Sequence, residues 1–249
     1  MTAEHWTRDV RRRLGLGRLL PLGEAGDGAW LAESAARAFL AGAVVSLPDV
    51  LLGAVRVGLA DPADVAEPVV PPPPSALPPG PLRVTAEFSA TAAEPLPVTA
   101  QRLRTALATA AREGLGLAVA EVDLRVIALL DETMEPARDT GPAPVDTAGG
   151  YGVRAGGDTG GADEALAATA ALAVPGVAGL TGSLGGLGRP VHLEERTQDG
   201  VALPHRHARV EITVRAGHRP VDVARAVRAA VSQALPDRPT VAVLVTAIS

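Results

Sequence analysis

Residues 208–235, ARVEITVRAGHRPVDVARAVRAAVSQAL, decide how this chain folds. The first seven of them alternate between apolar and polar side chains, which predicts a strand with one buried face and one wet face. A turn with glycine and proline follows, and then a helix whose apolar residues recur every four positions. Asp222 stands at the start of that helix, where we expect its side chain to cap the first amide groups.

The same pattern occurs earlier in the chain. The segment 82–88, LRVTAEF, alternates in the same way, and a helix follows Thr99, which is expected to be its cap. The apolar residues of the two helices match at a constant offset along the chain, namely Leu103, Leu107 and Ala111 in the first helix and Val227, Val231 and Leu235 in the second.

Both patterns belong to a longer order, helix-strand-strand-helix-strand, that occurs twice. An Ala-rich helix opens each copy and ends at a proline step, and an apolar run closes each copy. The opening helices are predicted over 31–46 and 163–173, the proline steps are Leu47-Pro48-Asp49-Val50 and Val174-Pro175-Gly176-Val177, and the closing strands are predicted over 117–129 and 240–248.

We therefore predict an α+β protein of two tandem α-β-β-α-β modules, each a small mixed sheet with helices on one face. A segment rich in Gly, Pro, Asp and Thr divides the two copies and is expected to be a disordered linker. The Pro-rich insertion is predicted to be an extended loop outside the core. The predicted parts are an N-terminal basic segment (1–30), the first module (31–130) with its insertion (61–81), the linker (131–162) and the second module (163–249).

Composition narrows the function classes. The chain has 249 residues, 28 acidic and 23 basic side chains, a net charge of −5 and 2% aromatic residues, which argues against a nucleic-acid binder. Every basic residue is Arg and Asn is absent, as expected of a protein from a high-GC bacterium. The longest uncharged stretch, 165–188, contains Pro175 and six glycines, so we expect no transmembrane segment and a cytoplasmic location, with a membrane-peripheral role left open.

No pattern in the sequence indicates catalysis. Cysteine is absent, which excludes a thiol nucleophile and a Cys-ligated metal. Ser183 lies in a glycine-rich turn without the surroundings of a nucleophile elbow, and the same turn lacks the Lys-Ser/Thr of a phosphate-binding loop. We predict a protein that is not an enzyme and has no cofactor.

Three histidines, His192, His205 and His207, are the weak candidates for a metal site. In a hairpin of 191–194 with 207–214, His192 and His207 are predicted to share the wet face with Glu194, Arg209 and Glu211. Metal ligands must converge on one point, so a solvated polar face is the favoured interpretation and no metal is predicted.

Arginines supply the candidate interaction residues. In the N-terminal segment Trp6 belongs to a narrow apolar ridge beside Arg11, Arg12 and Arg13; this helix packs on its own domain or binds an anionic surface. Arg225 and Arg228 lie on the last helix and are candidates for contact with a partner. With three arginines of the earlier helix they also define a nucleic-acid hypothesis, which the charge balance disfavours; those three are Arg102, Arg104 and Arg112.

The second copy resembles the bacterial alkaline shock protein family of the envelope stress response. The resemblance lies in VPGVAGLTGSL (174–184), in the strand and helix of 210–235, and in TVAVLVTAI (240–248). The first copy matches more loosely, since Asp49 replaces a glycine and the Pro-rich insertion departs from the pattern. Close relatives are expected to carry a nucleopolyhedrovirus-family label, although the sequence contains no viral chemistry.

This resemblance implies a non-enzymatic cytoplasmic protein that associates with a small membrane-anchored protein or with itself. The expected function is thus a scaffold or adaptor of the cell-envelope stress type, acting through protein–protein contacts near the cytoplasmic membrane face. The alternative is a small-ligand or regulatory binding module that uses the groove between the two copies.

Overall fold

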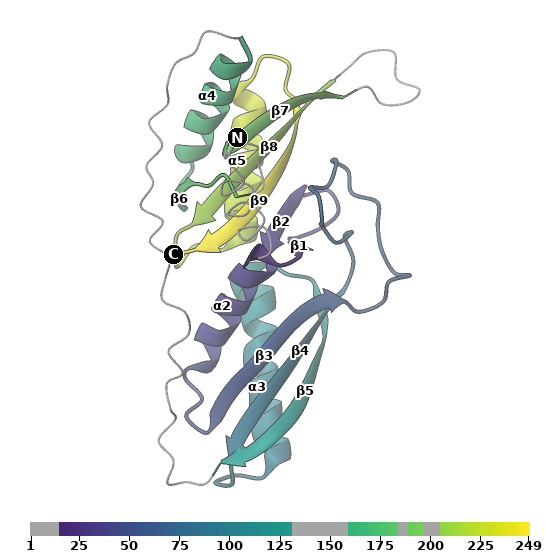
Figure 1. Cartoon of the computed structure of the whole chain (residues 1–249), viewed down its shortest axis with the longest axis vertical. Helices are drawn as coiled ribbons and strands as arrows, with labels where there is room; N and C mark the ends of the chain where they lie inside the picture. Colours follow the sequence, from purple (N-terminus) through teal and green to yellow (C-terminus); the bar gives the residue numbers. More distant parts are fainter. Residues whose placement is uncertain (1–14, 131–158, 184–188, 197–204) are drawn as a thin grey trace, which may run out of the picture.

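Two α-β-β-α-β modules lie end to end in the computed structural model, which describes residues 15–130, 159–183, 189–196 and 205–249 (Figure 1). The predicted α+β class with two modules is confirmed. The predicted linker falls mostly outside the described residues, and its last four positions already belong to a helix that begins at Thr159.

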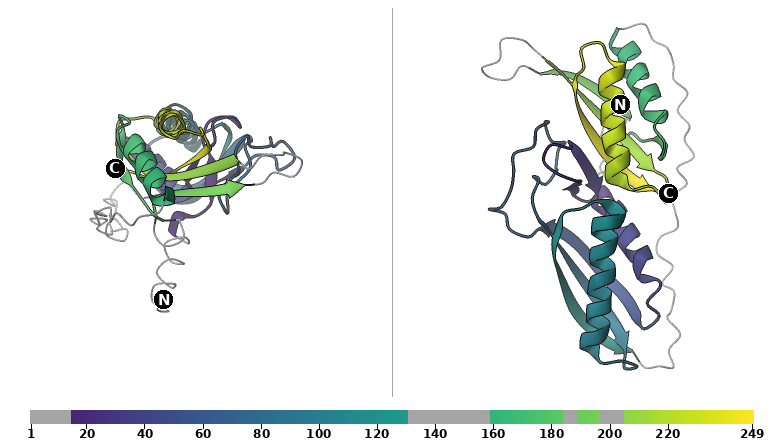
Figure 2. Two further views of the ribbon diagram at one scale, coloured as in Figure 1. Left: turned by 90° about the horizontal axis from the view of Figure 1, so that it is seen from above. Right: turned by 180° about the vertical axis from the view of Figure 1, so that it is seen from behind.

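The N-terminal module is a three-stranded sheet with helices packed on one face (Figures 1 and 2). Its central strand β4 is antiparallel to β3 and parallel to β5. The elements are α2 (Glu33–Val44), β3 (Val50–Leu59), β4 (Leu82–Thr91), α3 (Leu96–Thr109) with a π-helical turn η1 (Ala110–Leu115), and β5 (Val119–Leu130).

The C-terminal module repeats this plan with its first strand divided into two. Both parts, β6 and β7, are antiparallel to the central strand β8, which is parallel to β9. The elements are α4 (Thr159–Leu172), β6 (Val177–Leu180), β7 (Val191–Arg196), β8 (His205–Val214), α5 (Pro220–Ala234) and β9 (Thr240–Ile248).

Backbone details repeat as well. The amide of Thr91, at the end of β4, donates to the carbonyl of Asp49 at 3.1 Å, and the amide of Arg215, just after β8, donates to the carbonyl of Gly176 at 2.8 Å. The register of each parallel pair also shifts by one residue at the same place, after Phe88 in β4 and after Ile212 in β8. Bulges are rare in parallel pairs, so their repetition is strong evidence for an internal duplication.

The matched helix faces form the core, as predicted. All six apolar residues that the sequence pattern aligned between the two helices are buried. The predicted helix caps are wrong, however, because α3 begins at Leu96 and α5 at Pro220, so Thr99 and Asp222 lie inside the first turn and accept no capping hydrogen bond from its amides. Proline at the first helical positions already has the backbone angle of a helix and needs no amide partner.

A hairpin from the start of the chain completes the C-terminal sheet. The strands β1 (Leu19–Pro21) and β2 (Ala29–Ala32) are antiparallel to each other, and β2 pairs in parallel with β9. The strand order is therefore β1-β2-β9-β8-β6, with β7 also paired to β8. Residues 19–30 thus belong to a sheet and not to a separate basic segment, and the helix predicted from residue 31 begins at Glu33.

The expectation of one wet face holds for β4 and fails for β8, and the apolar closing strand β9 is buried as well. His207 and Glu211 on β8 are only 4% and 1% exposed, although the pattern placed both in water. In β9 every side chain from Val241 to Thr246 is buried. Both strands lie inside the sheet, between β2 on one side and β6 and β7 on the other. Consecutive side chains on both of their faces are buried, and strands covered on both faces lose the alternation typical of a half-exposed strand.

The Pro-rich insertion also differs from its prediction as an external loop. Val70 is 1% exposed and belongs to the core. The amide of Leu77 donates to the carbonyl of Leu19 at 2.8 Å, and the indole nitrogen of Trp30 donates to the carbonyl of Leu77 at 3.4 Å. The insertion therefore packs on the β1–β2 hairpin and covers it.

A substitution at Gly28 tests the packing of the insertion on the hairpin. The φ of Gly28 is +58°, a conformation that favours glycine, and a Cβ there would stand 2.6 Å from Val70 Cγ2 and 3.1 Å from the carbonyl oxygen of Val241. We expect Gly28→Ala to lower the free energy of unfolding by about 1–3 kcal/mol, measured by urea denaturation.

The matched control is Gly26→Ala in the same loop, where a Cβ would have no atom within 4 Å and the backbone is not left-handed. It should change stability by less than about 0.5 kcal/mol. Equal stabilities for the two variants would contradict the close approach of β2, β9 and the insertion.

Candidate interaction surface

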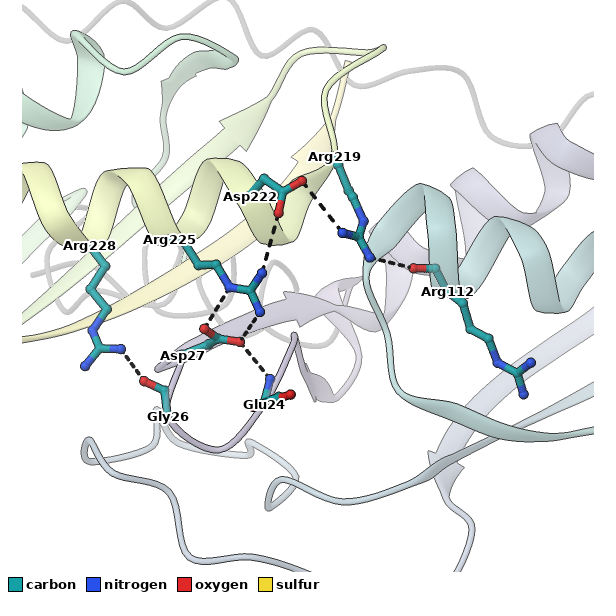
Figure 3. A network of polar contacts seen from close by, with 8 residues as sticks. All are labelled: Glu24, Gly26, Asp27, Arg112, Arg219, Asp222, Arg225 and Arg228. Carbon is teal, nitrogen blue, oxygen red and sulfur yellow. Dashed lines mark hydrogen bonds and ion pairs between the residues drawn. The ribbon is translucent and has the colours of Figure 1, made fainter.

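A cluster of charged side chains joins the β1–β2 hairpin to α5 (Figure 3). Arg225 donates from Nε and from one terminal nitrogen to the two carboxylate oxygens of Asp27, each at 2.8 Å. Asp27 also accepts the amide of Glu24 at 2.7 Å, and Arg228 donates to the carbonyl of Gly26. These paired bonds hold the loop that precedes β2 against the helix.

The same cluster reaches the N-terminal module. Arg219, at the start of α5, donates to the carbonyl of Arg112 at 3.0 Å. The hydrogen bond from Arg225 holds the pKa of Asp27 below its usual value, although partial burial acts in the opposite direction. The hydrogen bond to Asp27 correspondingly raises the pKa of Arg225. The contact between the hairpin loop and α5 therefore depends on the ionised carboxylate of Asp27.

These contacts change the interpretation of the predicted arginines. The guanidinium groups of Arg225 and Arg228 are engaged within the chain, and so are those of Arg102 and Arg104 on α3 and Arg112 on η1. Arg102 pairs with Asp49 and Glu94, Arg104 donates to the carbonyl of Val122, and Arg112 donates to the carbonyl of Val119. The remaining interaction candidates, Trp6, Arg11, Arg12 and Arg13, lie outside the described residues.

The three histidines do not converge. His207 is buried and its Nδ1 lies 2.9 Å from the hydroxyl of Thr240, while His192 Nε2 lies 3.1 Å from a carboxylate oxygen of Glu194 on the same strand. His205 begins β8, opposite Arg196. In the part of the chain that the structure describes, no three His, Cys, Asp or Glu side chains gather where they could hold a metal ion.

A salt bridge occupies one position on the β3 edge of the N-terminal sheet. Arg18 donates to the carbonyl of Val57 on β3 at 2.8 Å, and the amide of Val57 donates to Glu33 at 3.3 Å. Burial acts to raise the pKa of Glu33, but the hydrogen bonds from Arg18 and Val57 outweigh it and hold that pKa below its usual value. The ion pair thus satisfies the outer amide and carbonyl of Val57 as a neighbouring strand would.

The opposite edge, formed by β5, carries exposed aliphatic side chains. Val126, Ile127 and Leu129 are 41%, 53% and 62% exposed. Among the described strands β5 pairs only with β4, so its outer edge has no neighbouring strand there. Large aliphatic side chains on an unpaired edge are a feature that folded proteins usually cover.

A shallow groove of about 330 Å³ runs between α3 and the first half of β5, and we call it the α3–β5 groove. Arg104 and Arg112 reach across it to the edge carbonyls of β5, and Glu113 also lines it. On β5 the lining of the groove ends at Val122, and the exposed aliphatic side chains begin four residues further along the same strand, at Val126. Sequence reasoning missed both the groove and the aliphatic edge of β5, although the unbroken apolar run VIALL at 126–130 is a signal for that edge.

A second groove lies between the two copies, as the alternative function requires. It has a volume of about 560 Å³ and is formed by α2, by the turn after β8 and by the end of β9. Ser34 and Thr246 bring its two hydroxyl groups, and that of Thr246 is already bonded to the hydroxyl of Thr181 at 2.8 Å. Its other lining side chains are small or apolar, so the groove does not gather the converging polar groups of a small-ligand site.

Comparison with family models, with curated proteins and with solved structures returned no significant match for this chain. The resemblance to alkaline shock proteins therefore rests on the sequence motifs alone. No helix among the described residues is long and apolar enough to cross a membrane.

The contact of Asp27 with Arg225 predicts a pH-dependent stability. Because the pKa of Asp27 in the folded chain lies below its ordinary value of 3.8, its stabilising effect is complete above that pH and is lost as the pH falls through the lowered value. Asp27→Asn should lower the free energy of unfolding by about 1 kcal/mol at pH 7. The difference from the unaltered chain should shrink in acid, measured by urea denaturation from pH 7 to pH ~2.5.

Asp222→Asn is the control, since Asp222 is more exposed and lies 3.6 Å from the same arginine. It should change stability by less than about 0.5 kcal/mol at either pH. A constant difference between Asp27→Asn and the unaltered chain over the whole pH range would show that another group is responsible.

Proposed function

We propose that this protein is a non-enzymatic scaffold or adaptor of the cell-envelope stress type, which works through protein–protein contacts. The observation that carries the proposal is the unpaired edge of β5 with its exposed Val126, Ile127 and Leu129. An apolar strand edge binds other polypeptide chains through backbone hydrogen bonds and apolar contact together.

The electrostatics of the module support the same proposal. On the face of the sheet away from the helices, Arg83 lies 2.6 Å from Glu121 and Arg125 lies 3.6 Å from Glu87, so these charges neutralise one another. The edge beyond them is aliphatic and carries no such pair in the described residues. Contact with a folded or extended protein segment suits this surface better than contact with a polyanion.

The resemblance of the second copy to alkaline shock proteins supplies the proposed setting. It favours a cytoplasmic protein that either lies near the membrane through a membrane-anchored partner or associates with itself.

Site-directed photo-crosslinking in the native host tests the function. A photoreactive residue in place of Ile127 should capture a defined protein, identified by mass spectrometry and recovered with the membrane fraction. The control is the same residue in place of Val65, which is 42% exposed on the insertion and outside the β5 edge.

A charge at this position should remove the contact. Recovery of the partner with an Ile127→Asp chain should fall by about tenfold or more, because an unpaired carboxylate would be buried in an apolar interface. Crosslinks at Ile127 that do not exceed those at Val65 would contradict the proposed function.

A further inference from the structure

The duplication allows the two modules to be compared position by position. Because Phe88 pairs with Val126 before the bulge and Ile212 pairs with Val245 before the equivalent bulge, Val126 corresponds to Val245. The outer edge of β5 therefore corresponds to the outer edge of β9. The helix pattern makes Arg104 on α3 the counterpart of Arg228 on α5.

In the C-terminal module this edge is occupied. The strand β2 lies parallel along β9, and the amide of Val243 donates to the carbonyl of Gly28 at 2.9 Å. Arg225 and Arg228 hold the loop before β2 through Asp27 and Gly26 (Figure 3). The bound segment therefore has an acidic residue followed by the apolar strand Ala29–Ala32.

In the N-terminal module the α3–β5 groove lies at the corresponding place. Gln101 and Arg104 of α3 line it where Arg225 and Arg228 of α5 hold the hairpin loop. Arg104 donates to the carbonyl of Val122, whose counterpart Val241 has its carbonyl against Gly28 of the hairpin. The same arginine position thus contacts the module's own strand in one copy and the added segment in the other.

The chemistry of the groove indicates what it binds. Arg104 and Arg112 satisfy the carbonyl groups of the first half of the β5 edge, where they take the place of an incoming strand. A guanidinium group binds a carboxylate more strongly than a neutral carbonyl, so an acidic side chain would draw Arg104 from Val122. Beyond the groove, the exposed Val126 and Leu129 suit an apolar continuation of the same segment.

We propose that the α3–β5 groove and the adjoining edge of β5 accept an extended segment of a partner protein, in which an acidic residue precedes apolar residues, as a strand parallel to β5. This inference rests on the proposed function and names the docking site and the partner's chemistry. The hairpin β1–β2 on β9 is the precedent within the same chain.

The test uses the full chain and a fluorescent peptide with the sequence of residues 24–33, EAGDGAWLAE, which copies the segment that β9 binds. Binding is followed by fluorescence anisotropy. Val126→Pro should raise Kd by about tenfold or more, because the amide of Val126 corresponds to an outward-facing amide of β9 and proline removes it. Thermal unfolding checks that this edge variant is folded.

Arg104→Ala is the second variant and should raise Kd by about fivefold or more. Arg102→Ala is its matched control, because Arg102 lies on the same helix and pairs with Asp49 and Glu94 outside the groove. A peptide with Asn in place of Asp, EAGNGAWLAE, should bind as weakly to the unaltered chain as EAGDGAWLAE binds to Arg104→Ala. When Arg104→Ala is combined with the Asn peptide, Kd should be no higher than with either change alone. This non-additivity indicates a direct contact between Arg104 and the Asp of the peptide.

Three results would overturn the proposal. The first is that the peptide does not bind. The second is that binding is insensitive to Val126→Pro and Arg104→Ala and falls with Arg225→Ala, which indicates that the peptide exchanges with β2 on β9. The third is that ultracentrifugation shows a dimer that Val126→Pro dissociates, which makes a second copy of the chain the occupant. Photo-crosslinking at Ile127 separates this inference from the proposed function. A captured protein together with a failed peptide leaves the function standing and removes the strand-acceptor site.

Discussion

The pairing of β2 with β9 is the contact on which the rest of the structure depends. The closing strand β9 is buried over most of its length and needs a neighbouring strand on each side, and its second neighbour comes from the start of the chain. The last residue of β2, Ala32, is followed directly by α2 at Glu33. The first helix of the N-terminal module is therefore tied to the sheet of the C-terminal module by a single peptide bond.

Charged residues secure this pairing at its ends. Asp27 and Arg225 hold the loop before β2, and Arg219 links the start of α5 to η1 of the N-terminal module. The Pro-rich insertion covers the hairpin through Val70 and Leu77. The insertion is thus a structural element of the junction, which explains why a loop so rich in proline contains a buried valine.

The two copies share a plan and differ at their edges. In the C-terminal copy the outer edge of the last strand is filled by β2. In the N-terminal copy arginines bind carbonyl groups in the first half of the β5 edge, and aliphatic residues stay exposed on its second half. Arg18 and Glu33 bind the backbone of Val57 on the opposite edge. Duplicated modules that differ in this way can use one edge for their own assembly and leave the other for a partner.

The sequence by itself determined the repeated order of helices and strands within the two modules but not the β1–β2 hairpin, because alternation and four-residue spacing are local properties of the chain. It predicted β9 at its observed bounds and the buried faces of α3 and α5. Only the tertiary structure decided which strands are neighbours. Burial of His207 and Glu211, the role of Arg225 and the open edge of β5 follow from contacts between segments far apart in the chain, and no local pattern encodes such pairing.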